Sequence, residues 1–176
     1  MEVKEIEDLI NSYGDIIYGF CIKLTLNKID ADDLYQQTFL KALEIKEKID
    51  RHNNPKNFLI SVAIGIWKNH RRKLSRRHGI INALSIEQEE FDIPDKNVDI
   101  FKSTYNKELE NEVTILVNGL NDKFRLPILM YYNLEMSIKD IALALKLPQG
   151  TVKSRLNRAK QVIKEKLIER GYDYYE

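Results

Sequence analysis

The chain has 176 residues, of which 43% are hydrophobic and 31% charged, which is typical of a globular protein with one ordinary domain or two small ones. No apolar run is long enough to cross a bilayer and the first residues do not resemble a signal peptide, so we expect a cytoplasmic protein without membrane insertion. The single cysteine excludes an intramolecular disulfide, and the formal net charge of +1 conceals separate basic and acidic blocks.

Apolar residues at helical spacing predict three packed helices in the first part of the chain, around residues 6–17, 34–43 and 59–66. The connection before the third helix contains turn-forming residues, and its Pro55 suits the opening of that helix. A basic block follows, and it contains no acidic residue: Lys68, Arg71, Arg72, Lys73, Arg76 and Arg77. Such a block favours binding to nucleic-acid phosphates over a merely solvated face. We place the end of the first domain at residue 78.

Helical periodicity fades in residues 79–105, where Pro94 interrupts the pattern and acidic residues dominate. This composition is typical of a flexible linker. Residues 106–176 regain helical periodicity, and no alternating strand pattern competes with it. The sequence therefore predicts an all-α fold with two small helical domains, residues 1–78 and 106–176, joined by a flexible acidic linker.

Residues 137–160 predict a helix-turn-helix. Ser137, followed three positions later by Asp140, is close to a capping box, which starts a helix. We expect this helix to run to about Lys146, the chain to turn at Leu147, and a second helix to begin with Pro148 as its first residue. Lys146 occupies the place where many such motifs have a left-handed glycine, at a cost of about 1 kcal/mol.

The second helix should bury Val152, Leu156 and Ala159 and turn hydrogen-bond donors and cations outward. Long basic and hydroxyl side chains on a helix can contact phosphates and base edges in the major groove. The sequence therefore favours a DNA-recognition helix. A solvated basic helix in a bundle is the simpler alternative.

The run LPQGTVKSRLNRAK at residues 147–160 resembles the minus-thirty-five-binding domain of ECF-type (extracytoplasmic function) sigma factors, the promoter-specificity subunits of bacterial RNA polymerase. Upstream, ADDLYQQTFLKA at residues 31–42 resembles the polymerase-binding helix of that family. Residues 55–77 resemble its helix for reading and melting the minus-ten element, with Phe58-Leu59 in place of the usual Trp-Leu, and with Ile64 and Gly65 where Arg and Asn are common. The resemblance extends over residues 6–167.

This resemblance implies an alternative sigma factor that binds core RNA polymerase and directs promoter-specific initiation, and it assigns three groups of residues. The group expected to contact polymerase is Asp32, Asp33, Leu34, Gln36, Gln37 and Phe39. The minus-ten group is His52, Asn53, Asn54, Lys56, Phe58, Lys68, Asn69, Arg71 and Arg72. The minus-thirty-five group is Thr151, Lys153, Ser154, Arg155, Asn157, Arg158 and Lys160. The residues alone leave simpler roles open, because Leu34, Phe39 and Trp67 also fit a core and residues 52–54 also fit a turn.

The expected partners are core RNA polymerase, promoter DNA and an anti-sigma factor, and the acidic linker would run near the polymerase active centre or RNA exit path. We expect no cofactor, metal or enzymatic activity, because the three histidines form no spaced ligand set and the chain has no glycine-rich phosphate loop. The main rival is a stand-alone helix-turn-helix regulator. A protein-binding helical adaptor is a third hypothesis, and it would show no salt-dependent DNA affinity.

Overall fold

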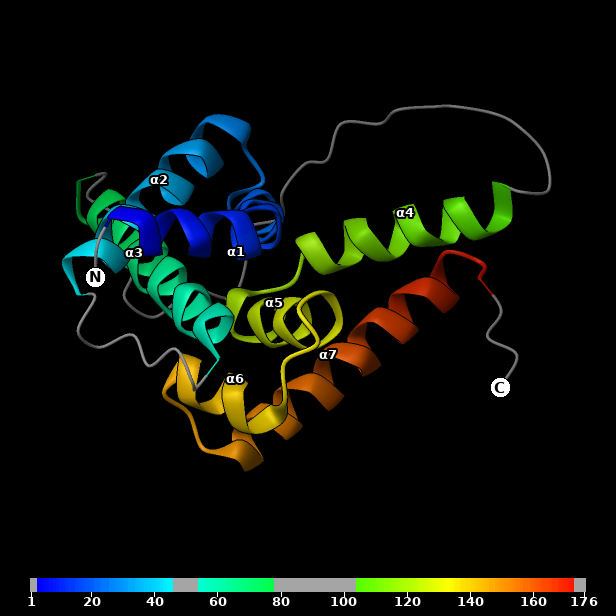
Figure 1. The fold of residues 1–176 in the computed structure, drawn as a ribbon. Coiled ribbons are helices and arrows are strands. Elements are labelled where there is room, and N and C mark those ends of the chain that lie inside the picture. Colours follow the sequence, from blue (N-terminus) through cyan, green and yellow to red (C-terminus); the bar gives the residue numbers. More distant parts are fainter. Residues whose placement is uncertain (1–2, 46–53, 78–103, 173–176) are drawn as a thin grey trace.

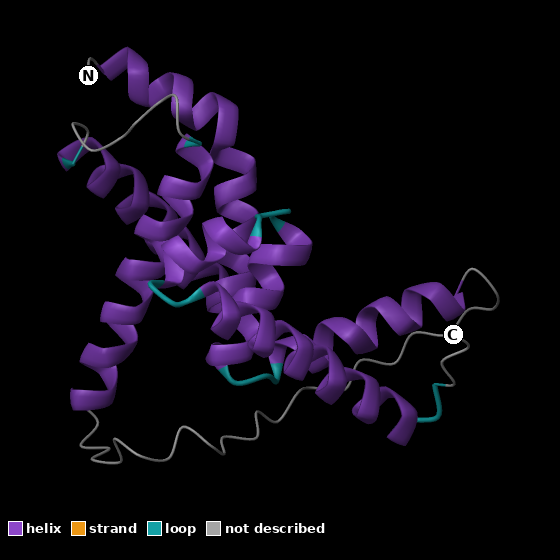
Figure 2. Ribbon diagram, turned by 90° about the horizontal axis from the view of Figure 1, so that it is seen from below, coloured by secondary structure: helices purple, strands orange, loops and turns teal. Residues whose placement is uncertain are grey.

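The computed structural model describes residues 3–45, 54–77 and 104–172, and all regular structure in these ranges is helical (Figures 1 and 2). The elements in chain order are α1 (Val3–Thr25), α2 (Lys28–Glu44), α3 (Pro55–Arg77), α4 (Thr104–Asn118), α5 (Asp122–Ile128), a π-helical turn η2 (Leu129–Asn133), α6 (Ile138–Leu145) and α7 (Gln149–Glu169). The predicted all-α class is confirmed. Most of the predicted linker lies outside the described residues, and its last two residues belong to α4.

The helices α1, α2 and α3 pack against one another as the N-terminal region. Their shared core includes the fully buried side chains of Phe20, Leu24 and Ile60. Cys21 lies in the same core, and burial raises the pKa of its thiol to about 12. The third helix begins at Pro55, as predicted, and the Asn54 side chain accepts a hydrogen bond from the Asn57 amide at its start.

The remaining helices form the C-terminal region, in which α7 contacts α4, α5 and α6. The chain enters α5 through an Asn121 cap and carries Pro127 inside the helix, after which the backbone continues as η2. Its core includes these buried side chains: Leu126, Leu129, Met130, Ile141, Val152, Leu156, Ala159 and Leu167. In Figures 1 and 2, α4 and the C-terminal half of α7 extend away from the N-terminal helices.

The predicted helix-turn-helix is confirmed as α6 and α7. The Ser137 hydroxyl accepts from the Asp140 amide at 3.1 Å and donates to the Asp140 carboxylate at 2.7 Å, so this pair starts α6. Lys146 ends α6 in the left-handed conformation, with φ of 56° and ψ of 50°. Pro148 is the N-cap of α7 and not its first helical residue, because its ψ of 145° is extended. The helix therefore begins at Gln149, one residue later than predicted.

Replacing Lys146 with glycine should stabilise the protein. A side chain at positive φ costs roughly 1–2 kcal/mol, and the greater freedom of glycine in the unfolded chain offsets about half of this. We therefore expect Lys146→Gly to raise the free energy of unfolding in urea by about 0.5–1 kcal/mol. Lys146→Ala is the matched control, because it removes the same charge but keeps the β-carbon. A similar gain in both variants would assign the effect to the lysine charge.

The two regions also pack against each other, chiefly through contacts between α3 and α6. Figure 1 shows α5 and α6 beside α3. A single hydrophobic core cluster spans both regions. The surfaces predicted to bind DNA therefore lie close together in this structure.

Candidate nucleic-acid interface

The first surface is the exposed face of α7. The three residues predicted to point inward, Val152, Leu156 and Ala159, are buried. Of the minus-thirty-five group, Thr151 and Arg155 are half-buried and the others are exposed: Lys153, Ser154, Asn157, Arg158 and Lys160. One helix thus presents cations, an amide and a hydroxyl together, which are the groups that contact phosphates and base edges.

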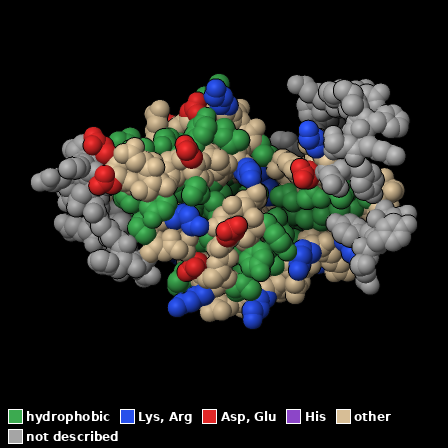
Figure 3. Space-filling model, turned by 45° about the vertical axis from the view of Figure 1, so that its right-hand side comes forward, with side chains coloured by type: hydrophobic (Ala, Val, Ile, Leu, Met, Phe, Trp, Pro, Cys, Tyr) green, Lys and Arg blue, Asp and Glu red, His purple; other side chains and the backbone are tan. Residues whose placement is uncertain are grey.

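The start of α7 has a second property suited to an anion. Its N-cap is Pro148, whose side chain forms no hydrogen bond with the first turn. The first amides of a helix lack intrahelical partners and carry partial positive charge, so this end attracts phosphate. In Figure 3 Lys and Arg side chains lie along the lower edge of the molecule, where Figure 1 places α6 and the start of α7.

The second surface is the C-terminal half of α3. Lys68, Asn69, Arg71 and Arg72 of the minus-ten group are all exposed at the residue level. The pKa of Lys68 is lowered, chiefly because its ammonium group is partly buried. The nearby positive charge of Arg155 on α7 lowers it further. The charges of α3 and α7 are therefore close enough to repel each other.

The rest of the minus-ten group is dispersed. Asn54 is exposed, Phe58 is half-buried, and His52 and Asn53 lie outside the described residues. The Lys56 ammonium donates a hydrogen bond of 2.9 Å to the Leu134 carbonyl oxygen in the C-terminal region. The structure thus brings Lys56 to the contact between the two regions.

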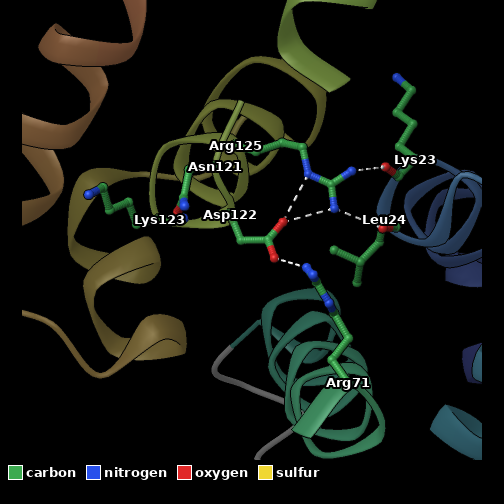
Figure 4. Close-up of polar contacts among 7 residues, drawn as sticks. All are labelled: Lys23, Leu24, Arg71, Asn121, Asp122, Lys123 and Arg125. Atoms are coloured by element: carbon green, nitrogen blue, oxygen red, sulfur yellow. Dashed lines mark hydrogen bonds and ion pairs between the residues drawn. The ribbon is translucent and has the colours of Figure 1, made fainter. Parts of the chain in front are cut away.

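A cluster of four side chains joins the two regions, and we call it the bridge cluster: Trp67, Arg71, Asp122 and Arg125. The Asp122 carboxylate lies between two guanidinium groups, pairing with Arg71 through one oxygen and with Arg125 through the other (Figure 4). The ring of Trp67 lies 5.2 Å from the Arg71 guanidinium and 5.8 Å from that of Arg125. Both distances allow cation–π attraction.

Arg125 is only 4% exposed, although it carries a charge. Its guanidinium donates to the carbonyl oxygens of Lys23 at 3.4 Å and Leu24 at 3.0 Å, in the last turn of α1. Burial lowers the pKa of Arg125, whereas the neighbouring Asp122 carboxylate acts in the opposite direction. A buried charge is tolerated when it is paired and hydrogen-bonded, and Arg125 meets both conditions.

The predicted polymerase group lies on α2 and divides between two faces. Leu34 and Phe39 are buried, and Asp32 accepts a hydrogen bond of 2.7 Å from the Tyr18 hydroxyl. Asp33, Gln36 and Gln37 are exposed, with the Gln37 amide donating to Asp33 at 2.6 Å.

Sequence reasoning did not include the exposed apolar residues that share α2 with this polar group. Ile29, Leu40 and Leu43 are exposed, Leu40 to 62%. With Asp33 and Gln36 they follow the i, i+4, i+7, i+11 and i+14 spacing of one helix face. We call this face the α2 stripe: Ile29, Asp33, Gln36, Leu40 and Leu43. A helical projection of α2 would have revealed it, because its apolar residues lie on two sides.

The bridge cluster was also missed. Asp122 and Arg125 have the i, i+3 spacing of an ordinary surface pair, and the sequence holds no signal that they meet α1 and α3.

Among the helices that the structure describes, none combines the length and apolar character needed to span a membrane.

Comparison with known proteins gives two family matches in one chain. The model named Sigma-70 region 2 matches residues 9–77, and the model named Sigma-70, region 4 matches residues 112–163. The ECF RNA polymerase sigma factor SigM of Bacillus subtilis is 29% identical over 168 residues, covering 94% of this chain and 96% of SigM. The ECF RNA polymerase sigma factor SigW of the same organism is 25% identical over 166 residues, covering 91% of this chain and 87% of SigW.

Two solved structures have a similar fold. The sigma factor RpoE from Bartonella quintana, in complex with the anti-sigma factor NepR, matches with a TM-score of 0.70 and 22% identity, covering 93% of this chain and 96% of RpoE. CnrH in complex with the cytosolic domain of CnrY matches with a TM-score of 0.66 and 17% identity, covering 96% and 90%. These likenesses extend over both helical regions.

Proposed function

This chain belongs to the ECF-type sigma factors of bacterial RNA polymerase, and we propose that its two regions divide the recognition of one promoter. As a member of this family it binds core RNA polymerase and directs promoter-specific initiation, and it is not a stand-alone regulator. It acts by binding and positioning, as sigma factors do, and we infer that it works in the cytoplasm with the polymerase.

The observation that carries the proposal is the order of two family matches, each with a basic helix at its predicted DNA surface. In our proposal the exposed face of α7 reads the minus-thirty-five element, and the C-terminal half of α3, with Asn54, Lys56 and Phe58, engages the minus-ten element. We assign residues 1–78 and 106–176 as the two domains.

Run-off transcription tests this assignment. Core polymerase with the purified chain should initiate at discrete start sites on genomic templates, and core polymerase alone should not. Mapping those sites would give both promoter elements at once. Start sites without shared sequence elements at minus ten and minus thirty-five would contradict the proposed division of the promoter between the two regions.

We propose that the α2 stripe docks on core polymerase, because it combines exposed apolar side chains with the carboxylate and amide expected to make polar contacts. A large exposed apolar side chain at the centre of an interface commonly contributes 1–2 kcal/mol or more. Leu40→Arg should therefore weaken binding to core polymerase by about tenfold or more, as measured by competition with a labelled wild-type chain.

The matched control for this prediction is Ile16→Arg. Ile16 is 43% exposed on α1 and lies outside the α2 stripe, so the same change in polarity and charge should leave polymerase binding intact. Equal losses in both variants would argue against a specific role for the α2 stripe.

We also propose an anti-sigma partner. The structural relative RpoE was solved with the anti-sigma factor NepR, and the chain covers 96% of that protein. Affinity purification from the native host should recover such a partner under non-inducing conditions. Recovery of core polymerase alone under those conditions would contradict this part of the proposal.

A further inference from the structure

The turn between α1 and α2 contains a leucine in an unfavourable backbone conformation. Leu26 has a φ of 57°, in the left-handed region that glycine adopts freely and that other residues enter at a cost in free energy. It lies just after the end of α1, where glycine commonly ends a helix. Asparagine and aspartate tolerate this conformation because their side chains hydrogen-bond locally, which leucine cannot do. The geometry of the turn therefore does not explain the choice of leucine.

Hydrogen bonds on both sides of Leu26 hold the turn. The Thr25 hydroxyl donates to the Cys21 carbonyl oxygen at 2.9 Å and accepts from the Asn27 amide at 3.4 Å. The Asn27 side chain in turn caps α2 by accepting from the Ile29 amide at 2.8 Å. A strained residue persists where its surroundings fix its backbone in this way, and such residues concentrate at functional sites. The turn thus presents the Leu26 side chain in a fixed position.

The Leu26 side chain gains little from packing in return, because it is 49% exposed. A hydrophobic residue directly before an N-cap often packs on the fourth residue of the helix, which here is the small and fully buried Ala31. Ile29, three positions after Leu26, is 78% exposed, the largest exposure of a large apolar side chain among the described residues. The turn and the start of α2 therefore present two large apolar side chains to solvent.

These two side chains adjoin the α2 stripe. Ile29 is its first residue and Leu26 precedes it by three positions, so the exposed apolar residues continue from α2 onto the turn. Exposed apolar patches mark interaction sites. Asp30 and Asp33 are exposed beside them, which suits a partner surface with apolar and basic groups. Core RNA polymerase is the partner of this family, and the match to Sigma-70 region 2 over residues 9–77 includes the whole of this surface.

We propose that Leu26 is an anchor for core RNA polymerase, and that the turn keeps a leucine at positive φ because its side chain is used in this contact. This inference rests on the proposed function, and it extends the polymerase surface from the α2 stripe onto the α1–α2 turn. Because the turn is fixed before binding, little conformational freedom is lost when the complex forms. Stability of the free protein and affinity for polymerase therefore make opposite demands at this position.

Leu26→Asn separates the two demands, because asparagine adopts the left-handed conformation more readily than leucine and replaces the apolar side chain with a polar one of similar size. We expect the affinity for core polymerase to fall by about five- to tenfold, as for loss of one apolar anchor. Competition with a labelled wild-type chain measures this change. The urea midpoint should stay the same or rise, whereas a residue that acts only in the fold would lower the midpoint and the affinity together.

Two variants serve as controls. Leu26→Met keeps an apolar side chain on the same backbone, so it should bind polymerase within about twofold of the wild type. Glu135→Gly changes another exposed residue at positive φ, with φ of 52°, in the C-terminal region. It should relieve similar backbone strain and leave polymerase affinity unchanged. Leu26→Gly removes the side chain altogether, and it should weaken polymerase binding as Leu26→Asn does.

Wild-type polymerase affinity in a folded Leu26→Asn variant would overturn the proposal. Equal losses of affinity in Leu26→Met or Glu135→Gly would do the same, as would a weaker Leu26→Asn whose urea midpoint has also fallen. A wild-type dimer that Leu26→Asn dissociates, with polymerase binding intact, would assign the leucine to a second copy of the chain instead. Failure of the wild-type chain to bind core polymerase refutes the proposed function, whereas normal wild-type binding with an unaffected Leu26→Asn refutes only this inference.

Discussion

Replacing Lys153 or Arg158 with alanine should weaken promoter binding by about 1–3 kcal/mol for each side chain that reads a base. Both residues are exposed on α7, and the Arg158 guanidinium donates a hydrogen bond of 3.1 Å to the Gln161 side chain of its own helix. Loss of a side chain that holds a phosphate should instead reduce the salt dependence of binding. The magnitude of the slope of log K against log salt should then fall by about one. Fluorescence anisotropy with promoter and random duplexes over a salt series distinguishes the two roles.

Lys166→Ala is the matched control for this series. Lys166 is exposed on the same helix, beyond the region 4 match, so its loss removes one positive charge without touching the proposed recognition face. Unchanged affinity and unchanged salt slope in both Lys153→Ala and Arg158→Ala would place the recognition face elsewhere. A loss in the control equal to theirs would indicate a general charge effect.

Replacing Ile141 with alanine should destabilise the protein by about 2–5 kcal/mol. Ile141 is fully buried in α6, within the core that holds the two helices of the motif together. Truncation of a buried isoleucine loses the transfer free energy of its methyl and methylene groups and leaves a cavity. Urea unfolding followed by circular dichroism would give the change, and DNA binding should fall as the motif loses its fixed geometry.

Leu143→Ala in the same helix is the control. Leu143 is 69% exposed, so its truncation should change the free energy of unfolding by no more than about 0.5 kcal/mol. Equal losses in the two variants would mean that the packing of α6 differs from that described.

The helices that the structure describes could be predicted because their signals are local. Periodic apolar residues, the Ser137–Asp140 pair and Pro55 each act within a few residues, and each gave a helix or a helix start close to the observed one. The start of α7 was placed one residue too early, because the fixed φ of proline suits both an N-cap and a first helical position.

The candidate site was less accessible to sequence reasoning. The exposed face of α7 follows from periodicity, but periodicity does not distinguish Leu34 and Phe39, which are core, from Leu40, which is exposed. The pairing of Asp122 with Arg71 joins residues 51 positions apart. Nothing local to either residue encodes that contact, so only the packed regions reveal it.

Each region of the molecule binds a helix end of the other, since Arg125 donates to the last carbonyls of α1 and Lys56 to the Leu134 carbonyl at the end of η2. Separation of the regions breaks the hydrogen bonds to the α1 carbonyls and the Leu134 carbonyl together with the Asp122–Arg71 pair. A partly separated arrangement loses some of these contacts while the groups are still too enclosed to be hydrated by water. Separation should therefore be cooperative, with a packed and a separated population and few states between them. The apparent affinity of a partner that binds only the separated form is then reduced by the fraction of the protein in that form.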